Sequence, residues 1–227
     1  MNEIIFNNIG PLKKLEMEPG DLTLLVGPQA TGKTLFLQFI KLILDIRYIK
    51  YMLEGNAYIW KNLTWDNLLS IYLGESMQHV WSDKSKIFIN GDERKPEKIT
   101  NIKTGKNLKV FYIPAQRVTI LENSWPRAFA RFENSTPYIV KEFSDNLFFL
   151  MNQMFENKSN TIFSSTTTKL KNKIRETIDQ NIFKGAQLEI KTIENRKSLQ
   201  LSVSNKSSIS INCWSTGQRE FTPLLLG

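Results

Sequence analysis

One motif of eight residues constrains this chain more than any other feature of its sequence. It matches the pattern G-x-x-x-x-G-K-[ST] and reads Gly27, Pro28, Gln29, Ala30, Thr31, Gly32, Lys33 and Thr34. Loops of this pattern turn backbone N–H groups toward phosphate oxygens, their lysine reaches the β- and γ-phosphates, and their final hydroxyl reaches Mg²⁺. The motif therefore predicts a binding site for the phosphates of a nucleotide and for Mg²⁺, with Thr34 as a metal ligand.

The residues on both sides of this phosphate loop predict the strand and the helix that it needs. Residues 22–26 are apolar except for one threonine, and both this threonine and the valine are β-branched, which is typical of a buried strand. Residues 34–53 carry apolar side chains at helical spacing and contain neither glycine nor proline. A strand, a loop and a helix in this order aim a helix N-terminus at an anion. A glycine-rich turn without a ligand is the alternative interpretation.

Composition restricts the class of protein. The chain has 227 residues and a hydrophobic content of 41%, enough for one sizeable core or for a large lobe with a smaller one. It contains no run of about 18 apolar residues, so we expect no membrane span. The N-terminus lacks the apolar stretch of a signal peptide. Cys213 is the single cysteine, which excludes an internal disulfide and makes the cytoplasm the expected location.

The net charge of +8 is concentrated in two segments. Residues 84–109 hold eight Lys and Arg against three acids, and residues 169–206 hold nine against four. A basic surface attracts nucleic acid without sequence preference, so nucleic acid is a candidate partner. Two solvated lysine-rich faces are the alternative explanation.

Hydrophobic patterns predict further elements along the chain. We expect helices over residues 137–155 and 170–182, the second ended by Gly185, with a Ser/Thr-rich loop at 164–168. Strands are expected over residues 2–6, 87–89, 108–113, 188–190, 199–203 and 209–211. Turns are expected at residues 8–12 and 90–92. His79 has no neighbouring carboxylate or cysteine in the sequence, so we expect a surface or core residue and not a ligand.

Residues 215–220 form a second motif. Ser215 and Gln218 have the spacing of a capping box, which predicts that a helix begins here. Taken alone, this motif would indicate only a helix cap.

Together with the phosphate loop, the Ser-Thr-Gly-Gln run resembles the signature motif of ABC-type ATPases. Residues 112–117, which end in Gln116 and Arg117, resemble the Q-loop of the same family. Residues 8–12 and 27–29 resemble its soluble branch, which includes SMC-like chromosome and repair ATPases and OLD-like ATPases of bacterial anti-phage systems. The three motifs stand in the family's order and span nearly the whole chain.

This resemblance implies an α/β fold, namely the ABC-type head of the P-loop NTPases. Residues 1–114 would form a mixed β lobe with a parallel P-loop sheet, residues 115–184 a helical lobe, and residues 185–227 strands and the signature helix. ATP would be bound between two heads, with Ser215, Gly217 and Gln218 meeting the γ-phosphate of the other head. Gln116 would hold Mg²⁺ and the attacking water, which makes Lys33 and Gln116 the candidate catalytic residues. A plain strand-end hydrogen bond is the alternative role for Gln116.

The sequence departs from the family pattern in two ways. Gln29 stands where related heads often have asparagine, which is a mild change. The acidic pair that ends the Walker B strand, the D-loop and the switch histidine should follow the signature helix and do not occur before Gly227. We therefore expect the chain to be the first part of a longer protein; a degraded or split head is the alternative.

The function implied is an ATP-dependent switch. Two heads, as a homodimer or a higher homo-oligomer, would pair when ATP binds and control a partner such as a nuclease or toxin in anti-phage defence, or a DNA-bound complex. Hydrolysis is expected of the complete protein. One alternative is a small-molecule kinase, with Arg127 and Arg131 as lid arginines. Another is an assembly scaffold that binds ATP without hydrolysing it.

Overall fold

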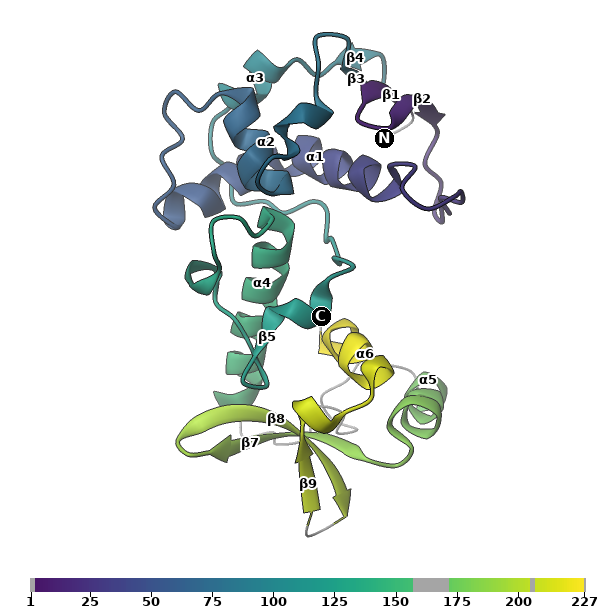
Figure 1. Cartoon of the computed structure of the whole chain (residues 1–227), viewed down its shortest axis with the longest axis vertical. Coiled ribbons are helices and arrows are strands. Elements are labelled where there is room, and N and C mark those ends of the chain that lie inside the picture. Colours follow the sequence, from purple (N-terminus) through teal and green to yellow (C-terminus); the bar gives the residue numbers. More distant parts are fainter. Residues whose placement is uncertain (1–2, 157–171, 205–206, 227) are drawn as a thin grey trace. The chain divides into compact units, whose positions relative to one another are not determined.

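The computed structural model describes residues 3–156, 172–204 and 207–226 (Figure 1). The chain divides into two compact units. We call Met1–Tyr112 with Glu133–Ile139 the N-terminal unit, and Ile113–Phe132 with Val140–Gly227 the C-terminal unit. Residues 115–184, which were expected to form a helical lobe, are divided between the two units, because Glu133–Ile139 belongs to the N-terminal unit.

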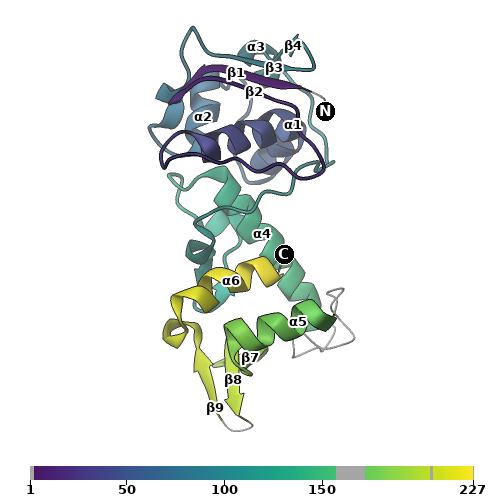
Figure 2. The same ribbon diagram turned by 90° about the vertical axis from the view of Figure 1, so that its right-hand side faces the viewer.

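The N-terminal unit is built on an antiparallel sheet of four strands in the order β2-β1-β3-β4 (Figure 2). Its strands are β1 (Ile4–Ile9), β2 (Leu12–Met17), β3 (Lys86–Ile89) and β4 (Asp92–Glu93). Asn8, near the end of β1, and Gly10, in the turn that joins β1 to β2, adopt positive φ angles of 52° and 51°. The predicted N-terminal hairpin, the strand at 87–89 and the turn at 90–92 are confirmed.

A long helix, α1 (Lys33–Gly55), packs against this sheet (Figure 2). The ring of Phe6 on β1 lies 4.8 Å from the ring of Phe36 and 6.1 Å from that of Phe39, and all three side chains are fully buried. Apolar residues at helical spacing thus cover the inner face of an alternating strand, as the sequence predicts. The unit also contains α2 (Trp65–Leu73), the 3₁₀ turn η1 (Met77–Val80) and α3 (Pro96–Thr100).

The expected strand over residues 22–26 is wrong. Leu22, Leu24 and Val26 have exposed fractions of 81%, 77% and 91%, and no described strand pairs with this segment. A strand-forming composition produces a strand only where a neighbour supplies the hydrogen-bond ladder, and here the described strands pair among themselves. All pairings between described strands are antiparallel, so the described residues do not form the expected parallel sheet.

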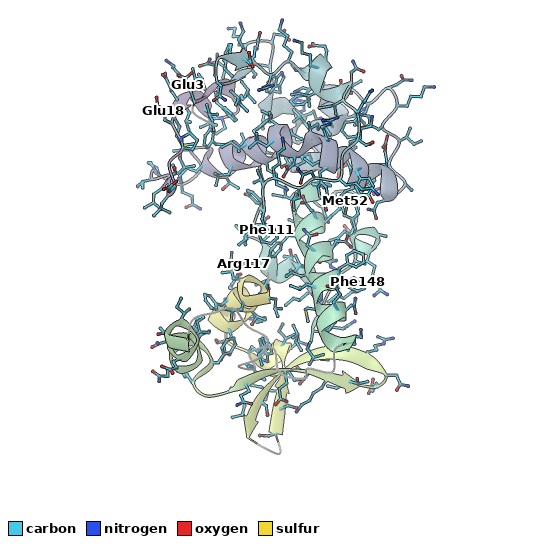
Figure 3. All side chains as sticks on the ribbon, turned by 180° about the vertical axis from the view of Figure 1, so that it is seen from behind. Glu3, Glu18, Met52, Phe111, Arg117 and Phe148 are labelled. Carbon is cyan, nitrogen blue, oxygen red and sulfur yellow. The ribbon has the colours of Figure 1, made fainter. Side chains whose placement is uncertain are left out.

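The expected strand over residues 108–113 is also wrong, for a different reason. The carboxylate of Asp45 accepts hydrogen bonds from the backbone N–H groups of Lys109 and Val110 at 2.8 and 3.0 Å. The ammonium of Lys41 donates to the Val110 carbonyl at 2.8 Å and lies 3.2 Å from Asp45. Two buried side chains of α1 thereby bind backbone groups that a neighbouring strand would otherwise bind. Phe111 follows with an exposed fraction of 49% (Figure 3).

The C-terminal unit combines short hairpins with three helices and an antiparallel sheet in the order β7-β8-β9. Its first elements are η2 (Arg117–Ile120), β5 (Leu121–Glu122), β6 (Trp125–Pro126), η3 (Phe129–Arg131) and α4 (Tyr138–Glu156), which begins in the N-terminal unit and continues into this one from Val140. Its later elements are α5 (Asn172–Ile178), the π-helical turn η4 (Asp179–Phe183), β7 (Gln187–Ile193), β8 (Arg196–Ser204), β9 (Ser207–Ser210), η5 (Ile211–Cys213) and α6 (Thr216–Leu226).

The core of this unit follows the predicted patterns. Leu188, Ile190, Leu199 and Leu201 are buried at alternate positions of β7 and β8, and α4 buries Phe143, Leu147 and Met151 at helical spacing. The helix at 137–155 and the three C-terminal strands are confirmed, and the helix at 170–182 is confirmed over its described residues, ending in a π-helical turn. Gly185 follows with a φ of 82°. The expected loop at 164–168 lies outside the described residues.

Within the described ranges, none of the helices combines the length and the apolar character needed to cross a membrane.

Candidate functional site

The phosphate loop leads from the exposed segment at 22–26 directly into α1. Gly32 precedes the helix with a φ of 92°, a left-handed conformation that glycine adopts without strain. A Cβ atom at Gly32 would lie 2.9 Å from Cγ of Leu12 and 3.0 Å from Cγ of Pro11. Both the backbone angle and the close packing therefore require glycine here. Ala30 also has a positive φ, 62°, which costs a non-glycine residue about 1–2 kcal/mol.

The ammonium of Lys33 lies at the centre of the loop. Lys33 donates hydrogen bonds to the carbonyls of Gly27 at 2.8 Å and Pro28 at 2.5 Å, and its Nζ lies 3.3 Å from Oγ1 of Thr31. The Thr31 hydroxyl in turn donates to the Pro28 carbonyl at 2.9 Å. The loop is thus curled around its own lysine, and the loop's carbonyls hold the ammonium in place.

A hollow of about 440 Å³ opens beside the loop. It is lined by residues 29–35, by Pro11 at the β1–β2 turn, by Gln38 of α1, and by Met77 and Val80 of η1. The N–H of Gly10 donates to the Val80 carbonyl at 2.7 Å and so ties the β1–β2 turn to η1. The volume of the hollow is in the range of small-molecule sites, about 300–1,000 Å³.

The first turn of α1 is suited to an anion. Gly32 provides no side-chain cap, and the first turn contains no acidic residue, so no carboxylate of its own competes at the positive end of the helix. Thr34 is exposed at this end. In the part of the chain that the structure describes, no cluster of three His, Cys, Asp or Glu side chains could hold a metal ion. A Mg²⁺ ion here would depend on Thr34 and on phosphate oxygens.

The second motif forms the expected capping box in the C-terminal unit. The Ser215 N–H donates to Oε1 of Gln218 at 3.0 Å, and the Gln218 N–H donates to Oγ of Ser215 at 3.3 Å. The amide Nε2 of Gln218 also donates to the Ile182 carbonyl at 3.1 Å, which fixes the start of α6 against η4. Gly217 is exposed, and a Cβ built on it would meet no atom within 4 Å.

Gln116 lies in the same unit as this capping box. It precedes η2 and is exposed, and it does not follow a strand as the Q-loop resemblance implies. The next residue, Arg117, donates from Nε to the Glu220 carbonyl of α6 at 2.7 Å, and its Nη2 lies 3.8 Å from the Glu220 carboxylate (Figure 3). The structure therefore brings Gln116 and α6 into one unit, while the phosphate loop belongs to the other.

The remaining residues singled out from the sequence are His79, Arg127 and Arg131. His79 is exposed on η1, in agreement with the expectation of a surface or core residue. Arg127 donates to the Thr119 carbonyl and stacks 4.1 Å from the ring of Phe132, so its guanidinium is held within its own unit. Arg131 is exposed and lines a different hollow, described below.

Sequence reasoning missed the pair of Lys41 and Asp45. Its signal was present, because an opposite-charge pair spaced i, i+4 interrupts the apolar stripe of a predicted helix. The lining of the hollow by Met77 and Val80 left no such signal, since it depends on how η1 folds back toward the loop.

No protein-family model matches the chain, and no curated protein and no solved structure matches it either.

Proposed function

We propose that residues 27–34 bind the triphosphate of ATP together with Mg²⁺, and that the chain serves as the head of an ABC-type ATPase. The observation that carries this proposal is the loop curled around the Lys33 ammonium at the uncapped start of a 23-residue helix. The lysine charge and the first-turn N–H groups belong to residues that line the 440 Å³ hollow. Anionic ligands are stabilised by both features.

The same proposal assigns the start of α6 to a second head. Gly217 is exposed and has open space around it, and the Ser215 hydroxyl and the Gln218 side chain hold the first turn in place. A helix N-terminus of this kind can approach a γ-phosphate presented by another copy of the chain. ATP would then join two heads in the cytoplasm, and the pairing would control a partner such as a nuclease, a toxin or a DNA-bound complex.

The proposal assigns ATP binding to these residues but no base for hydrolysis. Lys33, Thr34 and Gln116 can hold phosphate and metal, but none of them is a base that activates water. General-base assistance is typically worth about 10²–10⁴ in rate. Residues 1–227 should therefore bind ATP with negligible turnover.

The experiment that tests the phosphate loop is a nucleotide titration of Lys33→Ala against Lys13→Ala. Both variants lose one positive charge, and Lys13 is an exposed residue of β2 that does not line the hollow. Loss of a charged hydrogen bond costs about 1.5–3 kcal/mol, which corresponds to roughly 10- to 150-fold weaker binding of Mg·ATP to Lys33→Ala. Equal affinities of the two variants would remove the loop from the proposal.

The pairing is tested separately with Gly217→Asp and the matched Gly55→Asp. A Cβ at either glycine has open space, so neither aspartate should be excluded by packing. Gly217→Asp should still bind ATP but should fail to dimerise, because its carboxylate would face a γ-phosphate. Light scattering with a non-hydrolysable ATP analogue measures the pairing. A Gly217→Asp protein that dimerises as well as Gly55→Asp would contradict the role of α6.

A further inference from the structure

A second hollow, of about 500 Å³, lies within the C-terminal unit and does not involve the phosphate loop. Its walls come from the β5–β6 hairpin, the start of β8 and the helix α4. Both hairpins that border it have tight turns with two left-handed residues each, Asn123 and Ser124 in one and Glu194 and Asn195 in the other. Turns of this type match the twist of paired strands and hold the residues beside them in place.

Direct hydrogen bonds lock these three elements together. The N–H of Leu199 on β8 donates to the Ser124 carbonyl at 3.0 Å, which joins the two hairpins. The ammonium of Lys197 donates to Oδ1 of Asn152 on α4 at 2.7 Å and lies 5.8 Å from the ring centre of Trp125 on β6. The hollow is therefore formed before any ligand arrives, and a preformed site spends less free energy on ordering its walls.

The lining combines aromatic, cationic and amide groups. Trp125 and Phe148 provide aromatic surface, and Phe148 projects from α4 (Figure 3). Arg131 and Arg196 are exposed at the hollow. No ion pair among the described residues neutralises either guanidinium.

The charge and the amides narrow the choice of ligand. Three cations line the hollow against one carboxylate, that of Glu122, so an anion is favoured over a neutral or cationic ligand. Asn123 and Asn152 also line it, and side-chain amides both donate and accept hydrogen bonds. An aromatic wall, guanidinium groups and amides together match the base, the phosphate and the polar base edge of a nucleotide.

We propose that this hollow binds one unpaired nucleotide, with its base against Trp125 and Phe148 and its phosphate at Arg131 and Arg196. Free nucleotide and single-stranded nucleic acid share this chemistry. A base paired within a duplex could not enter, because its faces are covered by its neighbours in the stack. The site is independent of the ATP site proposed above.

The probe is a fluorescent oligothymidylate of about 12 nucleotides, within the site size of about 4–16 nucleotides that single-strand binders use. Binding is measured by anisotropy in the Lys33→Ala background, so that the phosphate loop contributes nothing. We expect binding at about 50 mM salt that weakens steeply as salt is raised. A duplex of the same length should bind less tightly, and thymidine 5′-monophosphate serves as competitor.

Matched variants separate the site from general charge and general surface. Phe148→Leu should weaken oligonucleotide binding about 5- to 150-fold, the range for loss of one stacked base, while Phe111→Leu in the other unit should not. Phe111 has an exposed fraction of 49% and does not line the hollow. Arg196→Gln should weaken binding and lower the salt slope by about one, whereas Lys184→Gln, which removes an equal charge elsewhere in the unit, should do neither.

Each outcome decides the proposal or identifies the source of the nucleotide. If the monophosphate competes as well as the oligonucleotide, the site takes free nucleotide; much weaker competition identifies a single strand. Both results support the assignment. It is overturned if neither probe binds, if duplex binds as tightly as single strand, or if the variants of each pair lose binding equally. If Phe148→Leu fails to fold, Arg196→Gln carries the test because its side chain is exposed.

Discussion

Replacing Gly32 by alanine should damage the phosphate loop through two separable effects. The backbone φ of 92° places the new residue in a left-handed conformation, which costs about 1–2 kcal/mol for a residue with a Cβ. The new Cβ would also lie 2.9 Å from Cγ of Leu12, and overpacking of this kind costs about 1–3 kcal/mol. Together they predict that the unfolding free energy falls by about 2–5 kcal/mol.

Gly91 isolates the backbone effect within the same unit. Its φ is 82°, and a Cβ there would meet no atom within 4 Å. Gly91→Ala should therefore lose only about 1–2 kcal/mol. The difference between the two variants, about 1–3 kcal/mol, measures the contact of residue 32 with Leu12 and Pro11.

Urea unfolding, monitored by circular dichroism, gives the unfolding free energies of the two variants. A titration with Mg·ATP gives the nucleotide affinity of the loop. Gly32→Ala should lose stability and nucleotide affinity, while Gly91→Ala should keep its affinity. Equal losses of stability in both variants would show that the loop does not pack against the β1–β2 turn as described.

Three further predictions concern the exposed segment and the buried charges. Leu24→Ala should change the unfolding free energy by less than about 0.5 kcal/mol because Leu24 is 77% exposed, whereas Leu42→Ala should lower it by about 2–5 kcal/mol because Leu42 is fully buried. Urea unfolding measures both variants, and equal losses would place residues 22–26 in a core. Asp45→Ala should lower the unfolding free energy by about 3–5 kcal/mol in the same assay, since it leaves the Lys41 ammonium buried without its carboxylate. A loss below about 1 kcal/mol would contradict the hydrogen bonds from Lys109 and Val110 to Asp45. Burial raises the pKa of the Asp145 carboxyl, so the contribution of this group to stability is present at low pH and is lost as pH rises through the raised pKa. Asp145→Asn should therefore flatten this part of the dependence of the unfolding free energy on pH, and an unchanged dependence would contradict the prediction.

Elements that carry their own pattern could be predicted from the sequence. Apolar residues at helical spacing predicted α1 and α4, and the Ser215 and Gln218 spacing predicted the start of α6 through a local pair of hydrogen bonds. Alternating apolar residues likewise predicted β7 and β8. In each case the signal and the structure depend on residues close together in the chain.

The two failed strands depend on partners that composition does not reveal. Residues 22–26 have a strand-forming composition, but no described strand lies alongside to pair with them. For residues 108–113, the hydrogen bonds of Lys109 and Val110 go to Asp45, more than sixty residues away in the chain. Whether an extended segment becomes a strand depends on this wider context.

The candidate sites also differ in whether they depend on residues close together in the sequence. The phosphate-loop residues lie together because the motif is continuous in sequence, so the loop could be located in advance. The hollow between Trp125, Phe148 and Arg196 joins three segments that no local pattern connects, so it could only be found in the folded chain.

The central claim, that residues 27–34 bind the triphosphate of ATP, is tested most directly by the phosphate dependence of binding. Calorimetric titrations of the unmodified chain with ATP, ADP, AMP and adenosine, each with Mg²⁺, measure it without any substitution. If the Lys33 ammonium and the first turn of α1 bind the β- and γ-phosphates, affinity should fall in the order ATP, ADP, AMP, and adenosine should not bind. Adenosine or AMP binding as tightly as ATP would contradict the account.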